Sequence, residues 1–123
     1  MQVLVSAGWD RTVQIWDARL QRSVRSIYGP YCCGDSLDLR GGLILTGSWR
    51  SADPLELWDM GSSRLVTRLP FYQPELDACR PYAAKFGQGT LNGCIVSGGS
   101  GKRPCVKLFS PVRLWDMFYP LKM

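Results

Sequence analysis

Residues 13–17 read VQIWD, and the chain repeats this segment as LELWD at 55–59, VKLFS at 106–110 and VRLWD at 112–116. Each copy is an alternating run of apolar residues that closes on an aromatic side chain. The first two copies are separated by a spacing within the ~40–45 residues that a four-stranded β module requires. Repetition at this distance indicates one structural unit copied in tandem, and it predicts an all-β fold.

The residues that precede each copy are repeated as well. VSAGW at 5–9 corresponds to LTGSW at 45–49 and, more loosely, to VSGGS at 96–100. Each unit therefore holds an apolar run, a small hydroxyl residue, a Gly/Ser turn and a second strand with one apolar face. The 8 prolines and 13 glycines argue against long helices, because both residues disfavour the helix interior. The units are predicted to be β-hairpins.

With these segments the chain resembles the WD-repeat (WD40) family of β-propellers. The resemblance rests on the Trp-Asp pairs at 16–17, 58–59 and 115–116 and on the Ser/Thr-containing turns before the first two. It implies an incomplete propeller, an open arc of about 2.5 four-stranded antiparallel blades. We expect a single partial propeller domain over residues 1–123, with strands two to four of blade one at 2–28, blade two at 33–70 and a partial blade three at 79–119.

The resemblance also assigns a set of structural repeat residues. In the family, a His between blades joins a turn Asp, a Ser/Thr and the Trp in one hydrogen-bond chain. This sequence has no histidine, and the turn slots of blades two and three hold Arg50 and Gly101. We therefore expect incomplete networks and weaker blades. The structural repeat residues are Ser6, Asp10, Trp16, Asp17, Thr46, Trp58, Asp59, Ser97, Phe109, Trp115 and Asp116.

The last copy begins too soon after the third to start another blade. By elimination, residues 112–121 are expected to form the fourth strand of blade three, although their sequence resembles that of a third strand. We hypothesise a splice or truncation junction near Ser110-Pro111. Because a propeller needs ~4–8 blades, the chain is expected to be a fragment or truncated isoform of a longer WD-repeat protein, to self-associate through open blade edges, or to be a truncated product without independent function.

Composition favours a protein inside a reducing compartment. Five cysteines occur without a Cys-x-x-Cys pair, so we expect structural thiols, no metal site and a cytoplasmic or nuclear location. No apolar run is long enough for a membrane span, and no signal peptide is recognisable. The net charge of +5 allows a basic nucleic-acid-binding module as an alternative function. The basic residues are dispersed, however, and this favours protein partners.

Catalysis is not expected. Without histidine, most triads and hydrolytic metal sites are excluded. Asp17, Asp59 and Asp116 are interpreted as turn residues that follow the repeated strand. We predict no enzyme activity and no cofactor.

Four residues are predicted to contact a partner: Trp9, Arg11, Trp49 and Arg50. They fall in the turns between strands two and three, which the resemblance places on a flat face used for partners. Tryptophan and arginine are the residue types enriched at binding hot spots. The alternative is that each tryptophan folds back over the adjacent blade with the arginine solvated beside it. The predicted function is a non-catalytic protein–protein interaction scaffold or adaptor.

Overall fold

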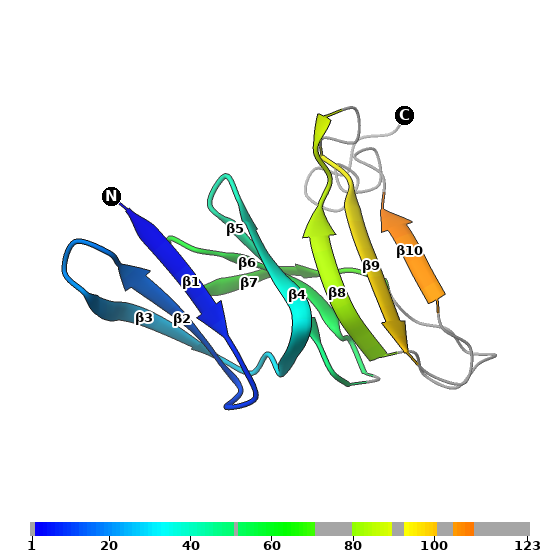
Figure 1. The fold of residues 1–123 in the computed structure, drawn as a ribbon, viewed down its shortest axis with the longest axis horizontal. Helices are drawn as coiled ribbons and strands as arrows, with labels where there is room; N and C mark the ends of the chain where they lie inside the picture. Colours follow the sequence, from blue (N-terminus) through cyan, green and yellow to red (C-terminus); the bar gives the residue numbers. More distant parts are fainter. Residues whose placement is uncertain (1, 51, 71–79, 90–92, 101–104, 110–123) are drawn as a thin grey trace.

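The computed structural model describes residues 2–50, 52–70, 80–89, 93–100 and 105–109. Its regular elements in these ranges are antiparallel β-strands grouped into three blades (Figure 1). Blade one consists of β1 (Val3–Ala7), β2 (Thr12–Asp17) and β3 (Arg22–Tyr28). Blade two consists of β4 (Cys32–Arg40), β5 (Leu43–Ser48), β6 (Leu55–Asp59) and β7 (Arg64–Arg68). Blade three contains β8 (Arg80–Phe86), β9 (Ile95–Ser100) and β10 (Cys105–Phe109).

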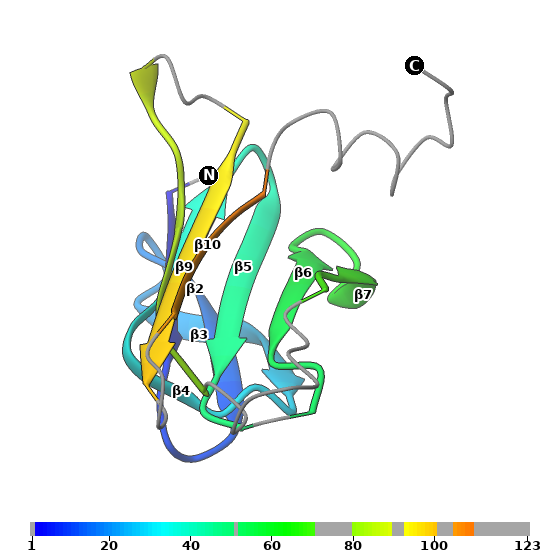
Figure 2. The ribbon, with the colours of Figure 1, turned by 90° about the vertical axis from the view of Figure 1, so that its right-hand side faces the viewer.

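The second and third blades meet at their inner strands. One parallel bridge, between Asp35 of β4 and Ala83 of β8, gives the strand order β10-β9-β8-β4-β5-β6-β7. Every other strand pairing in the described residues is antiparallel and stays within one blade. The three blades form an open arc, with blade one at one end and β10 at the other (Figures 1 and 2). This arrangement confirms the predicted incomplete propeller.

Burial explains why β5 is a continuous run of apolar and small residues whereas β2 alternates. In β2 the side chains of Val13 and Ile15 are buried and their neighbours are partly exposed, because only one face of blade one is covered. In β5 the run from Ile44 to Ser48 is buried throughout. A sheet covered on both faces requires such a continuous apolar or small-residue run.

Apolar side chains fill both junctions between blades. At the first junction, Val13, Ile15 and Ile27 of blade one share a core cluster with Ile44 of blade two. At the second, the side chains of blade two pack on those of blade three, in a cluster of Leu45, Leu55, Leu57, Leu69, Ala84, Phe86, Ile95 and Phe109. Each blade is thus stabilised mainly by the face of its neighbour.

Part of the hydrogen-bond chain that the resemblance implies is present in blades one and two. The Trp16 indole N–H donates to Ser6 Oγ at 2.9 Å, and the Trp58 indole N–H donates to Thr46 Oγ1 at 3.1 Å. In blade three the aromatic position holds Phe109, whose side chain has no N–H group.

The hydroxyl of Ser97, at the equivalent position of blade three, binds a backbone carbonyl and not an indole N–H. Ser97 Oγ donates to the carbonyl of Ala83 at 2.9 Å. The other predicted repeat positions, Trp115 and Asp116, lie outside the described residues, as do the fourth-strand slot at 112–121 and the junction near 110–111.

The aspartates of the repeat hold turns. Asp10 accepts hydrogen bonds from the Thr12 amide at 3.1 Å and the Thr12 hydroxyl at 2.9 Å. Asp17 Oδ1 accepts from the Arg19 amide at 2.9 Å. Asp59 Oδ2 accepts from the hydroxyl and the amide of Ser62, at 2.7 and 3.0 Å. In the described residues, the carboxylates of Asp10, Asp17 and Asp59 thus bind groups of the turn in which each lies.

The turn after β6 makes a pH-dependent contribution to stability. The hydrogen bonds from the Ser62 hydroxyl and amide hold the pKa of Asp59 below its usual range. Because the folded-state pKa is lowered, the contribution is present above the unfolded pKa and is lost as pH falls through the folded value. We expect Ser62→Ala to raise the pKa of Asp59, measured by carboxyl ¹³C NMR titration. Ser26→Ala in β3 is the control, and an unchanged Asp59 midpoint in Ser62→Ala would refute this role.

Candidate partner-binding surface

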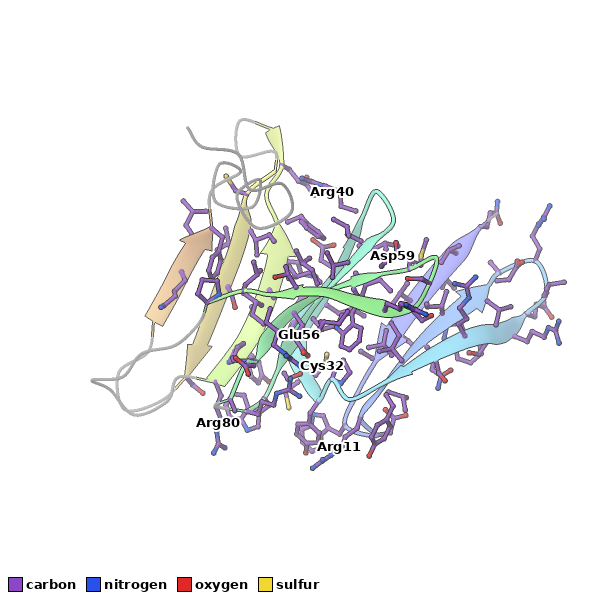
Figure 3. All side chains as sticks on the ribbon, turned by 180° about the vertical axis from the view of Figure 1, so that it is seen from behind. Arg11, Cys32, Arg40, Glu56, Asp59 and Arg80 are labelled. Carbon is purple, nitrogen blue, oxygen red and sulfur yellow. The ribbon has the colours of Figure 1, made fainter. Side chains whose placement is uncertain are left out.

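The predicted contact residues lie at one end of the blades. Trp9 and Arg11 occupy the turn between β1 and β2, and Trp49 and Arg50 follow β5 in the second blade. Figure 3 shows Arg11 and Arg80 at the same end of the molecule, away from Arg40 and Asp59. The turn between β1 and β2, the residues that follow β5 and the first residues of β4 and β8 lie at this end.

The first of two clusters at this end, named here the Trp9 cluster, consists of Trp9, Arg11 and Tyr31. The Trp9 and Tyr31 rings are stacked with centroids 6.3 Å apart and an interplanar angle of 20°. The Arg11 guanidinium carbon lies 5.5 Å from the centroid of the same Tyr31 ring. Trp9 remains 70% exposed. The Trp9 ring therefore exposes a wide aromatic surface to solvent, while its stacking on Tyr31 fixes its orientation.

The second cluster, named the Trp49 cluster, consists of Trp49, Arg80 and Tyr82. The Trp49 and Tyr82 rings meet edge to face with centroids 5.8 Å apart and an angle of 81°. The Arg80 guanidinium carbon lies 5.9 Å from the centroid of the Trp49 ring. Tyr82 is 55% exposed, whereas Trp49 is partly buried.

Both clusters bridge a junction between blades. In each, a tryptophan from the hairpin turn of one blade touches an aromatic or arginine side chain at the start of the next blade's inner strand. The alternative interpretation, that each tryptophan folds back over the adjacent blade, holds only in part. Trp49 leans on blade three, but neither tryptophan is shielded from solvent.

Sequence reasoning missed Tyr31, Arg80 and Tyr82. A signal was available, since the dipeptide Pro-Tyr occurs at 30–31 and again at 81–82. Both prolines are fully buried in the structure. A buried proline that anchors the start of an inner strand places the following tyrosine at the end where the hairpin turns lie.

Arg50 has a structural role that its predicted partner-contact role did not anticipate. Its guanidinium donates to Glu56 Oε1 at 2.9 Å and to the carbonyls of Ala52 and Asp53 at 2.9 and 3.0 Å. Glu56 is 3% exposed and also pairs with Arg68 at 3.3 Å. Arg50 therefore neutralises a buried carboxylate and shapes the loop before β6, and we leave it out of the proposed contact set.

Each of the two clusters carries the positive charge of one arginine, Arg11 or Arg80. In the part of the chain that the structure describes, the ion pairs are Arg50–Glu56, Arg68–Glu56 and Lys85–Asp35. Arg11 and Arg80 belong to none of them. Their guanidinium groups lie over aromatic rings and keep N–H donors available.

The Cys32 thiol near this end is not an activated nucleophile. Burial raises the pKa of the Cys32 thiol to about 11. Among the described residues, Cys32, Cys33 and Cys94 are free thiols, and no group of three Cys, Asp or Glu side chains is placed to hold a metal ion. The ranges given above contain no helix of the length and apolarity that a membrane crossing needs.

We predict that Cys32 reacts much more slowly with iodoacetamide at pH 8 in the folded chain than in the chain unfolded in urea. A raised pKa leaves little thiolate, and burial blocks access. Peptide-level mass spectrometry after timed labelling measures the rate at Cys32 separately from the other cysteines. Equal rates in the folded and unfolded chain would contradict the buried position.

No family model matches the chain. Over 65 residues it is 32% identical to Mitochondrial division protein 1 of Neosartorya fischeri, a WD-repeat protein, and to the protein of the same name in Aspergillus terreus. The matched region covers 53% of this chain and 10% of either relative. The match thus spans about a tenth of the length of these relatives.

Solved structures support the same fold. A chain of the Mitotic Checkpoint Complex superposes with a TM-score of 0.69 at 19% identity, covering 88% of this chain and 32% of that one. The computationally designed Ika4 protein superposes with a TM-score of 0.65 at 20% identity, covering 88% and 59%. The chain therefore has a WD40-like β-propeller fold. This conclusion rests on the repeated segments, the blade geometry and these similarities.

Proposed function

We propose, from this WD-repeat type of β-propeller fold, that the chain is a non-catalytic scaffold that binds another protein through the Trp9 and Trp49 clusters. The observation that carries the proposal is the pair of exposed tryptophan–tyrosine–arginine clusters at one end of the blades. Rigid blades that hold variable turns are a common basis for specific binding.

The composition of the clusters favours a protein partner. Aromatic and arginine side chains dominate the binding energy of protein interfaces, because they combine a large contact area with directional donors. The stacked rings are already ordered, which lowers the entropy lost on binding. Arg11 and Arg80 favour a partner segment that presents carboxylates between or beside apolar side chains.

The compartment and the origin of further blades are part of the same proposal. Buried free thiols support a reducing location, in the cytoplasm or nucleus. The blades that would flank this arc belong either to a longer WD-repeat polypeptide, as the sequence predicts, or to a second copy of the chain.

Site-specific photo-crosslinking in cells tests the proposed surface. A benzophenone amino acid replaces Trp9 or Tyr82, and Leu20, an exposed turn residue outside both clusters, provides the matched control position. We expect a discrete protein adduct from positions 9 and 82 and none from position 20. In a chain carrying Arg11→Glu and Arg80→Glu, the adduct should fall by about tenfold or more.

Two outcomes would overturn the proposal. The first is the same adducts from position 20 as from the clusters. The second is adducts that charge reversal leaves unchanged. Adducts removed by nuclease treatment would instead indicate the nucleic-acid-binding alternative.

A further inference from the structure

Two sheet faces, at opposite ends of the arc, carry apolar side chains that the described residues leave exposed. The leading face belongs to blade one and consists of Leu4, Ser6, Gln14 and Trp16. The trailing face belongs to blade three and includes Val106 and Leu108. Leu4 is 62% exposed, Val106 75% and Leu108 59%.

Strand register shows that Leu4 has buried counterparts in the other blades. Leu4 pairs with Trp16, Ile44 pairs with Trp58 and Ile95 pairs with Phe109. Each aliphatic residue thus lies beside the aromatic residue of the repeated segment, on the same face of its blade. Ile44 and Ile95 are both fully buried.

Leu108 has buried counterparts of its own. It directly precedes the aromatic residue of its strand, as Ile15 precedes Trp16 and Leu57 precedes Trp58. Ile15 is 4% exposed and Leu57 is 1% exposed. Burial at this position fails only in blade three, where the described residues place no sheet against the trailing face.

The two positions meet at each internal junction. Ile15 and Ile44 belong to the core cluster between blades one and two. Leu57 and Ile95 belong to the cluster between blades two and three. Leu108 and Leu4 are the third instance of this pair, but the arc holds them at its two ends (Figure 1). A contact between Leu108 and Leu4 therefore joins two copies of this arc.

We propose that the leading face of one chain packs on the trailing face of a second copy, and that the reciprocal contact closes a two-chain ring. The occupant is a second copy because each face matches the opposite face of the same chain, in the arrangement that already forms both internal junctions. A heterologous contact of this kind gives a closed assembly when its rotation returns to the start. Two three-bladed arcs supply a number of blades within the ~4–8 of known propellers. The Trp9 and Trp49 clusters lie at the strand ends and stay open.

Sedimentation velocity of the full 123-residue chain provides the first test. We expect a discrete dimer at micromolar concentration. Leu4→Lys and Leu108→Asp should each weaken dimerisation at least about tenfold, because each inserts a charge into an apolar contact. Leu20→Asp, a comparable change at a turn outside both faces, should leave the dimer intact. Circular dichroism checks that every variant keeps its β-structure.

Mixing the two weakened variants provides the decisive test. A chain with Leu4→Lys and a chain with Leu108→Asp should form a heterodimer, since one interface gains a Lys–Asp pair and the other is wild type. A wild-type chain that is monomeric, or that forms no species of discrete size, would overturn the proposal. A dimer that the mixture does not restore would also overturn it, because its faces would not pair head to tail.

Discussion

Replacing Arg50 with methionine is expected to lower the free energy of unfolding by about 3 kcal/mol, at the lower end of the cost of breaking a buried ion pair. The reason is the partner left behind. The Glu56 side chain is 4% exposed, and Arg50 supplies its shorter ion pair at 2.9 Å. Without Arg50, the ion pair that this carboxylate keeps among the described residues is the 3.3 Å contact with the more exposed Arg68. Urea denaturation followed by tryptophan fluorescence measures the change.

Two matched variants separate this explanation from a simple loss of contacts. Arg68→Met should cost less than about 1 kcal/mol, because the Arg68 side chain is 54% exposed. Glu56→Gln in the Arg50→Met background should recover part of the loss, since no buried charge then remains unpaired. Equal costs for Arg50→Met and Arg68→Met would contradict the assigned role of Arg50.

Gly47→Val is expected to destabilise the chain by about 3 kcal/mol, through overpacking at the second blade junction. A Cβ atom at Gly47 would lie 3.2 Å from the Cβ atoms of Pro81 and Ser36 and 3.4 Å from that of Ala84. These atoms belong to β4 and β8, so they move only if an inner strand moves. The branched side chain would push blade three away from blade two.

Gly8→Val serves as the control, because the nearest atom to a Cβ at Gly8 is Asp10 Oδ1 at 4.0 Å. We expect it to cost less than about 1 kcal/mol by the same denaturation measurement. If Gly47→Val lowers the free energy of unfolding no more than Gly8→Val does, β8 does not pack closely against β5 at Gly47.

The repeated segments of the sequence predicted much of the fold, because strand burial and turns depend on local residues. Alternation in 13–17 and 55–59 reports which face of a strand is buried, and the turns are defined by local Gly, Asp and Pro residues. The contact between β4 and β8 was not predictable in this way. It brings together residues far apart in the sequence, such as Asp35 and Ala83 at the parallel bridge.

In the candidate site, too, the residues that could be predicted depend on local sequence and the others depend on packing between blades. Trp9 and Trp49 were predictable because a tryptophan in a hairpin turn is a local feature. Tyr31, Arg80 and Tyr82 come from the following blade, so their approach depends on how blades pack.

Arg50 is a related case. It was assigned to the partner-binding surface because it lies in a turn, but its role depends on Glu56, a buried carboxylate with which it forms an ion pair. Sequence position gives the loop, and tertiary packing decides what a charged side chain in that loop must do.

The central claim is that each blade is held by the face of the next one, and methyl NOE spectroscopy of the Ile/Leu/Val/Ala-labelled chain tests it most directly. The structure predicts NOEs from Ile44 to the Val13, Ile15 or Ile27 methyl groups, and from the Ala84 or Ile95 methyl groups to those of Leu45 or Leu57. The pair Val5–Ile15, joined within blade one, is the internal reference. Spectra that show the Val5–Ile15 contact but none between blades would contradict the account.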